Sequence, residues 1–160
     1  MNKMQDLPLC DLNEVKRTAK RTDSDISGCK FSGEYLESED LSCLSFINCM
    51  FENCTFTDCD FERSSFVDVT FISCDLSNSS LDSSYLSRCE FRSCNLKAFK
   101  TSGSKYLSTS FFRTALGGVD FSTCLVSGLR VSDTFRELRN AVFSANQAVE
   151  LSMLLGIRIK

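Results

Sequence analysis

The chain has 160 residues, of which 42% are apolar and 24% are charged, and its net charge is −3. This length suggests one domain, and the small net charge gives no global attraction to nucleic acid or anionic membranes. Histidine is absent, which excludes Ser-His-Asp and Cys-His catalysis, zincin motifs and histidine pH switches. An enzyme would have to use Asp, Glu, Lys or Cys, so we expect a non-enzymatic protein without catalytic residues or cofactors.

The cysteine content and the two ends of the sequence indicate where the protein resides. Ten cysteines in a chain of this length fall below the density of a small disulfide scaffold. Residues 1–11 contain no apolar run of signal-peptide length, and the apolar run at 153–155 is too short to span a bilayer. We therefore expect a soluble, cytoplasmic protein with reduced thiols and no membrane contact.

Residues 1–23 are predicted to form an N-terminal cap that contains a short helix. Asp11 and Glu14 match a helix-start pattern, and Leu12, Val15 and Ala19 are spaced to share one helical face. The basic residues of this segment are Lys16, Arg17, Lys20 and Arg21. We expect the helix to cover one end of the structure that follows it.

Residues 24–131 are dominated by a repeat of five. Large apolar residues recur at every fifth position from Ile26 to Leu96 and again from Tyr106 to Val131, and only Thr101 interrupts the series. The position two residues before each large residue is mostly Cys, Ser, Thr or Val, and the other three positions are mostly polar. A period of five fits neither a helix nor a flat strand. A chain with two inward and three outward residues per unit must turn a corner in every unit, so four units close a coil of twenty residues.

The repeat resembles the motif of the pentapeptide-repeat family, which is small, Asp or Asn, Leu or Phe, polar, polar. Units that match it directly are 59–63 (Cys-Asp-Phe-Glu-Arg), 74–78 (Cys-Asp-Leu-Ser-Asn) and 119–123 (Val-Asp-Phe-Ser-Thr). The resemblance covers residues 24–131 and implies an all-β solenoid, a right-handed quadrilateral β-helix of about five coils.

Residues twenty apart should stack on successive coils, about 4.8 Å apart. The predicted aromatic core ladder consists of Phe31, Phe51, Phe71, Phe91 and Phe111. Cys54, Cys74 and Cys94 form a column of small inward residues. Cysteines five residues apart do not have the spacing of a zinc site, so we interpret them as core residues and expect no metal. Phe99 and Thr101 exchange the usual small and large positions, which indicates either a compensated swap or a local bulge that carries recognition.

The four faces of the coil are named here by their central residues. Face one contains positions 26, 46 and 66, face two 31, 51 and 71, face three 36, 56 and 76, and face four 41, 61 and 81. Faces three and four hold ten of the fourteen acidic residues within 24–131. The candidate acidic stripe on these faces consists of Glu34, Glu37, Glu39, Asp40, Asp58, Asp60, Glu62, Asp75 and Asp82.

The charge also changes sign along the chain. Residues 23–82 contain thirteen acidic and two basic residues, whereas residues 88–160 contain five acidic and eleven basic residues. Glu34 and Glu39 occupy inward positions, where a lone buried carboxylate is costly. We therefore expect the first coil to be open to solvent there or covered by a basic neighbour.

Residues 132–160 are predicted to contain the end of the last coil, a helix and a dimerisation segment. Ser144 and Gln147 form a capping box, and apolar residues continue to Leu155 before Gly156, which predicts a helix over about 145–155. Its apolar side chains lie on more than one face, and the family resemblance implies a two-fold dimer through such a helix. The candidate dimer contacts are Val149, Met153 and Leu154.

Three classes of function compete. The first is a structural or protein-binding rod with an unidentified partner. The second, implied by the family resemblance, is a duplex-DNA mimic that modulates DNA gyrase or topoisomerase IV, because a site built for a polyanion accepts carboxylates in place of phosphates. The third is an enzyme or a direct nucleic-acid binder, which the convex shape and the lack of interleaved exposed aromatics disfavour. We predict the first class, with the second as the alternative.

Overall fold

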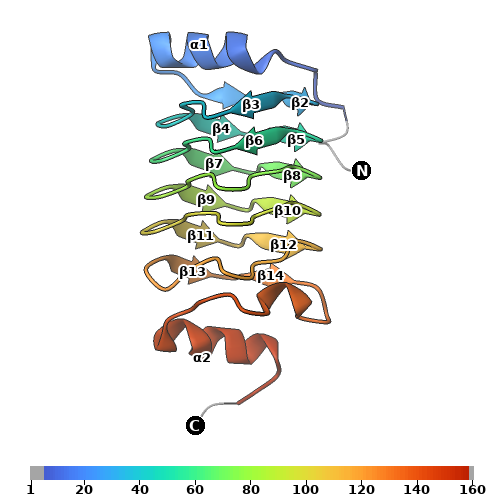
Figure 1. Ribbon diagram of the computed structural model, residues 1–160, viewed down its shortest axis with the longest axis vertical. Coiled ribbons are helices and arrows are strands. Elements are labelled where there is room, and N and C mark those ends of the chain that lie inside the picture. The colour runs from blue at the N-terminus through green and yellow to red at the C-terminus, as the bar shows by residue number, and fades with distance from the viewer. Residues whose placement is uncertain (1–5, 159–160) are drawn as a thin grey trace.

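The computed structural model describes residues 6–158 and shows a stack of coils with a helix at each end (Figure 1). Helix α1 (Leu12–Thr22) lies across the first coil, and helix α2 (Ala145–Leu154) lies beyond the last one. The strands between them are β1 (Ile26–Ser27), β2 (Lys30–Ser32), β3 (Tyr35–Glu37), β4 (Ser45–Ile47), β5 (Met50–Glu52), β6 (Thr55–Thr57), β7 (Ser65–Val67), β8 (Thr70–Ile72), β9 (Tyr85–Ser87), β10 (Glu90–Arg92), β11 (Lys105–Leu107), β12 (Ser110–Phe112), β13 (Leu125–Ser127) and β14 (Arg130–Val131).

The strands form parallel sheets in which each residue pairs with the residue twenty positions later. Face one is the sheet β1-β4-β7-β9-β11-β13, and face two is the sheet β14-β12-β10-β8-β5-β2. Face three has only the pair β3-β6, and isolated parallel bridges such as Asp60 with Ser80 continue faces three and four. The predicted solenoid of about five coils is confirmed.

The core is the predicted aromatic ladder. The five phenylalanines from Phe31 to Phe111 pair in register and are at most 1% exposed. Their ring centroids are 4.8–4.9 Å apart along the column, within the range in which aromatic stacking is attractive.

Small polar residues line the interior beside the ladder, and the backbone of the preceding coil satisfies most of them, although the buried Thr109 hydroxyl has no partner among the described residues. The thiol of Cys74 donates to the Phe51 carbonyl at 3.4 Å, and the hydroxyl of Ser84 donates to the Phe61 carbonyl at 2.9 Å. Because Cys, Ser and Thr can all make this contact, they alternate at the same repeat position. Cys54, Cys74 and Cys94 are buried, as the sequence predicted.

Every coil turns its corners through left-handed backbone. From Asp23 to Arg113 every fifth residue has φ between 51° and 68°. Only a few of these residues are glycine, and the left-handed region costs other residues roughly 1–2 kcal/mol each. The repeat therefore carries a recurring local strain, which the ladder and the core must offset.

The N-terminal helix is confirmed, including its start. The Asp11 carboxylate accepts a hydrogen bond from the Glu14 N–H at 2.9 Å, and Leu12 and Ala19 are buried against the first coil. The ammonium of Lys16 lies 3.0 Å from the Glu39 carboxylate. The expected basic cover of the first coil is thus present at Glu39, while Glu34 is half-buried.

The expectation that all thiols are reduced is wrong for one pair, because Cys10 and Cys29 form a disulfide. Pro8 and Cys10 flank Leu9, which pairs in parallel with Lys30. The N–H of Cys10 donates to the Lys30 carbonyl at 2.9 Å, and the Lys30 N–H donates to the Pro8 carbonyl at 2.8 Å. This short pairing brings the Cα atoms of the two cysteines to 5.7 Å, a distance that a disulfide requires. The repeat begins only after the segment that contains Cys10, so the sequence pattern did not reveal the pairing.

Two further features complete the description of the coils. Phe99 and Thr101 are both buried, and Ser80 still pairs with Lys100, so the region is a compensated swap without a bulge. The Thr101 hydroxyl is hydrogen-bonded to the Tyr106 hydroxyl inside the core.

Among residues 6–158, no helix is long and apolar enough to cross a membrane.

The corner strain gives a testable prediction at Ala98, which is exposed and has a φ of 55°. Ala98→Gly should raise the free energy of unfolding by up to about 1 kcal/mol, because glycine relieves the left-handed strain. Ala115 is also exposed but lacks a positive φ, so Ala115→Gly should lower stability by roughly 0.5–1 kcal/mol. Urea denaturation of both variants checks the pair, and equal effects would contradict the corner assignment.

Candidate interaction surface

The nine residues of the predicted acidic stripe all lie on the outer surface of faces three and four. Glu37, Glu39, Asp40 and Asp58 are exposed, and the other five are half-buried. They come from the first three coils, where the loops of these two faces stack on one another. The structure therefore places them on one convex surface, where only Asp82 borders a surface cavity among the described residues.

Three of the nine carboxylates hold the turns of their own coil. On faces three and four, the aspartate before the large core residue accepts a hydrogen bond from the N–H two residues later. The distances are 2.9 Å from Ser42 to Asp40, 2.7 Å from Glu62 to Asp60 and 2.9 Å from Ser77 to Asp75. Such Asx turns favour Asp and Asn for local structural reasons. Part of the acidic stripe therefore follows from turn chemistry.

Asn95 shows that the turn needs an acceptor and does not need a charge. Its side-chain oxygen accepts a hydrogen bond from the Lys97 N–H at 3.1 Å, in the column directly after Asp75. The Asn95 amide also donates to the Asp75 carboxylate at 3.0 Å. Burial alone would raise the pKa of Asp75, but the hydrogen bonds from Ser77 and Asn95 outweigh it, so this pKa is lowered.

Two carboxylates of the stripe, one of them the turn residue Asp40, are neutralised by the N-terminal helix. Lys16 pairs with Glu39 at 3.0 Å, and Lys20 pairs with Asp40 at 2.8 Å. The hydrogen bond from Lys20, with further bonds from Ser42, holds the pKa of Asp40 well below its usual range. The charge of the first coil is therefore set by whether α1 is in place.

The stripe carboxylates that neither the turns nor α1 explain are Glu34, Glu37, Asp58, Glu62 and Asp82, and we call Glu37, Asp58 and Glu62 among them the free acidic group. The Asp58 carboxylate makes no ion pair or hydrogen bond to any residue within 6–158, and Glu37 contacts only the Tyr35 hydroxyl, at 3.3 Å. Arg63 lies 3.9 Å from Glu62, at the limit of an ion pair. Asp82, one coil further on, accepts a hydrogen bond from the Ser102 N–H at 2.6 Å.

Charges on the other faces are mostly paired with one another. Arg88 binds both carboxylate oxygens of Asp68, at 2.7 and 2.8 Å, and this contact lowers the pKa of Asp68. Lys30 lies 2.8 Å from Glu52 on face two, where Arg92 also pairs with Glu90. Exposed pairs of this kind add little stability, but they leave faces one and two of the first four coils without a single-sign surface.

The C-terminal helix is confirmed over 145–154, and its side chains are only partly covered. Its capping box forms as predicted, and the Gln147 side chain donates to the carbonyls of Phe121 and Cys124 at 2.8 and 2.7 Å. Phe143 stacks on Phe121 with ring centroids 5.2 Å apart. Among the candidate dimer contacts, Met153 is 67% exposed, Val149 41% and Leu154 38%. No residue of the helix is fully buried.

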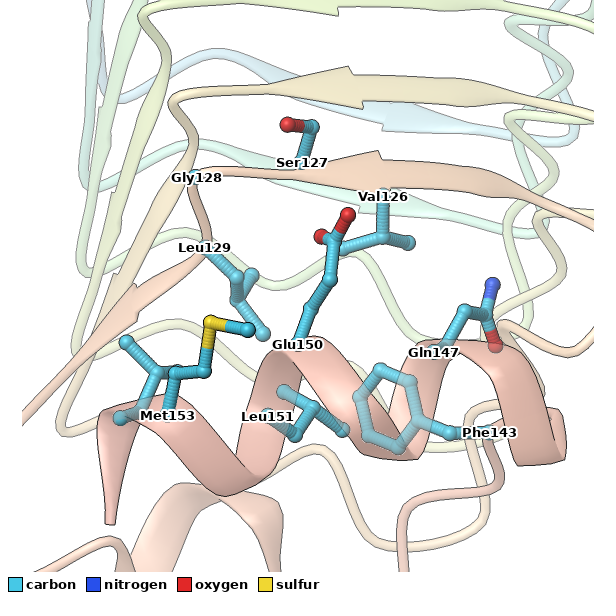
Figure 2. A pocket seen from close by; sticks show the side chains of 10 residues that line it. Val126, Ser127, Gly128, Leu129, Phe143, Gln147, Glu150, Leu151 and Met153 are labelled. Atoms are coloured by element: carbon cyan, nitrogen blue, oxygen red, sulfur yellow. The ribbon is translucent and has the colours of Figure 1, made fainter. Parts of the chain in front are cut away.

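A cavity of about 310 Å³ separates α2 from the last coil (Figure 2). Leu129 projects into it from the coil, and Leu151, Met153 and Phe143 line it from the side of the helix. The Glu150 side chain rises from α2 toward Val126. The helix thus rests on the coil through Gln147 and Phe143, while its C-terminal turn covers the apolar end loosely.

Sequence reasoning missed one buried charge at this end, Glu137. It is 6% exposed and lies in the 3₁₀ helix η1 (Arg136–Leu138). Its carboxylate accepts hydrogen bonds from the Arg113 N–H at 3.0 Å and the Ser132 hydroxyl at 2.7 Å. Burial opposes the charged form, but these bonds outweigh it and lower the pKa of Glu137. Because the five-residue period has ended here, no sequence signal marked this residue as inward.

Comparisons with known proteins agree with this architecture. The family model described as a pentapeptide repeat region matches residues 44–121. No curated protein sequence matches the chain. Within the part of the chain that the structure describes, no group of three or more Cys, Asp or Glu side chains is arranged to hold a metal ion.

Solved structures show the same fold at low sequence identity. The pentapeptide repeat protein Rfr23 from the cyanobacterium Cyanothece 51142 is 14% identical, with a TM-score of 0.67 over 82% of this chain and 99% of that one. Trypsin-treated QnrB1, a plasmid-mediated fluoroquinolone resistance protein, is 21% identical, with a TM-score of 0.50 over 84% and 91%. A pentapeptide repeat protein from the Arabidopsis thaliana thylakoid lumen is 18% identical, with a TM-score of 0.50 over 79% and 88%.

The turn role of the stripe can be separated from its charge at Asp60. Asp60→Ala should lower the free energy of unfolding by about 1 kcal/mol, because the Glu62 N–H loses its acceptor. Asp60→Asn removes the charge but keeps the acceptor, as Asn95 does naturally, and should change stability by less than about 0.5 kcal/mol. Chemical denaturation distinguishes the two. An Asn variant as unstable as the Ala variant would show that the charge itself stabilises the turn.

Proposed function

Because the chain is a pentapeptide-repeat protein, we propose that it is a non-enzymatic rod that binds a partner protein through faces three and four. The free acidic group carries this proposal. Glu37, Asp58 and Glu62 stand on a convex surface, and the turns and ion pairs of the fold do not require them. The partner it fits is a protein with a basic binding surface.

The other faces fit this role less well. Their carboxylates are largely engaged, as in the pairs of Glu52 with Lys30 and Asp68 with Arg88. An acidic surface without counter-charges steers a basic partner toward it and contributes more to the association rate than to affinity.

The experiment compares two triple variants of equal charge change. Glu37→Gln with Asp58→Asn and Glu62→Gln removes the free acidic group, and Asn suits the left-handed φ of 55° at position 58. Asp25→Asn with Glu52→Gln and Glu90→Gln removes three charges from faces one and two. A partner identified by crosslinking should bind the first variant at least tenfold more weakly, measured by surface plasmon resonance at low salt. Equal losses in the two variants would place the binding surface elsewhere.

Mimicry of duplex DNA toward a type II topoisomerase is the second candidate, and the charge density favours it. Seven of the nine stripe carboxylates remain after α1 neutralises Glu39 and Asp40. Three coils span about 14 Å, a length over which duplex DNA carries about eight charges. The likeness to QnrB1 supports this candidate through the fold alone. The function requires that the chain shares the cytoplasm with the topoisomerase.

A gyrase supercoiling assay, with and without a fluoroquinolone, decides between the two candidates. Under mimicry, the protein should change supercoiling or drug inhibition, and the triple variant of the free acidic group should not. The triple variant of faces one and two serves as the matched control and should behave like the unaltered protein. An unaltered protein without effect on gyrase leaves the first proposal in place and rejects the second.

We also propose that the rod is a homodimer joined through α2. This helix exposes Val149, Met153 and Leu154 and closes only loosely over the last coil. A two-fold contact would cover these side chains and place both acidic surfaces at the outer ends of the dimer. Basic residues lie near the joint, so apolar burial must supply the stability, and added salt should not weaken the dimer.

Met153→Glu with Leu154→Glu should therefore give a folded monomer. The matched control is Tyr35→Glu, which changes a residue that is equally exposed, at 68%, at the opposite end of the rod. Sedimentation equilibrium at tens of micromolar measures the mass, and circular dichroism checks the fold. A monomeric mass for the unaltered protein would refute the arrangement.

A further inference from the structure

We infer that the disulfide between Cys10 and Cys29 is a redox-sensitive latch, which holds the N-terminal cap against the first coil and opens when a dithiol reduces it. The cap comprises residues 6–23, including α1. The inference rests on where the two cysteines lie, on how weakly the rest of the cap is attached, and on what the cap covers.

The two cysteines join the cap to the body of the rod. Cys29 occupies an inward position of the first coil and is 7% exposed, whereas Cys10 is half-buried and directly precedes the helix-capping residue Asp11. Their Cα atoms are 5.7 Å apart. Near the disulfide, two backbone hydrogen bonds tie residues 8 and 10 to Lys30. The covalent bond therefore ties the N-terminal end of α1 to the first coil and closes a loop that contains the whole helix.

The remaining attachments of the cap are few. Leu12 and Ala19 of α1 are buried against the first coil. In the two ion pairs, the side chains of Glu39 and Asp40 are 47% and 66% exposed. Ion pairs at that exposure add little. In a stack of coils each end has a neighbour on one side only, so the ends open first. A disulfide that closes a loop of about twenty residues lowers the equilibrium constant for detachment of such a segment about 100-fold.

Reduction of the disulfide transfers two electrons from the dithiol to the Cys10–Cys29 bond. A thiolate of the dithiol attacks the Cys10 sulfur, which is the more accessible one, and Cys29 leaves as a thiolate that takes up a proton. The second thiol of the reductant then displaces Cys10, so that the reductant becomes a disulfide and the protein gains two thiols. Cys49, next in the column below Cys29, does not replace the reductant, because it is fully buried and burial raises its pKa.

Opening the latch has two structural consequences. The segment around Leu9 no longer covers β2, which leaves the outer edge of face two unpaired and available to another strand. Departure of α1 also removes Lys16 and Lys20 from Glu39 and Asp40, so the acidic stripe gains two free carboxylates. This second consequence rests on the proposed function, whereas the latch itself does not.

Limited trypsin digestion tests the latch, because α1 contains four cleavage sites, at Lys16, Arg17, Lys20 and Arg21. The protein is equilibrated in an oxidising glutathione buffer, and mass spectrometry of alkylated, unreduced peptides identifies the linked cysteines. We expect a Cys10–Cys29 linkage and slow cleavage in α1. After reduction with the dithiol dithiothreitol, cleavage in α1 should become about 100-fold faster, while cleavage at Lys105 in β11 stays unchanged.

Two variants complete the test. Cys10→Ser should be cleaved rapidly in both buffers, and Cys43→Ser, which alters an exposed free cysteine, should keep the full redox difference. The latch is overturned if no Cys10–Cys29 linkage forms, if Cys29 links to Cys49 instead, or if oxidised and reduced proteins are cleaved equally fast. The digestion experiment uses neither the gyrase assay nor the partner-binding assay. A negative result for the disulfide therefore does not contradict the proposed function.

Discussion

The structure depends on one constraint, which is that every coil must repeat the backbone hydrogen bonds of the coil before it at an offset of twenty residues. The Asp75 N–H donates to the Cys54 carbonyl at 2.9 Å, and the Asn95 N–H donates to the Cys74 carbonyl at 2.9 Å, and so on along the rod. This ladder fixes the side-chain columns, because residues in register must stack. It also places a corner in left-handed backbone at each fifth residue from Asp23 to Gly118, whatever residue the sequence supplies there.

The same constraint explains why the acidic surface has two origins. Several coils have a turn in place of a strand on faces three and four, and there a side chain accepts the hydrogen bond of the N–H after the core residue. Asp40, Asp60 and Asp75 supply it, and their charge accompanies a structural role. Glu37 and Asp58 have no such role, and they are the residues at which function can be distinguished from folding. A count of charges on a face cannot make this distinction, whereas the hydrogen bonds can.

The sequence predicts the coils well because the repeat leaves each residue one role. The phenylalanine ladder, the buried cysteine column and both helices lie where the spacing and the capping residues place them. The prediction is weaker where the repeat stops. Neither the pairing of Leu9 with Lys30 nor the burial of Glu137 follows from a period, since each depends on how an irregular segment folds back onto the rod. Likewise, the turn role of Asp60 needs the position of the Glu62 N–H.

The contacts at the two irregular ends therefore determine which charged and apolar surfaces of the rod are exposed. An inner coil is held by neighbours on both sides, so changes in its surroundings leave it in place. At the N-terminal end, a covalent bond and two lysines determine how much of the acidic surface is free. At the C-terminal end, an apolar helix rests on the coil through Gln147 and Phe143 and leaves Met153 outside. The proposed assembly at one end and the exposure of charge at the other therefore depend on separate contacts, and a change at one end can act without altering the coils between them.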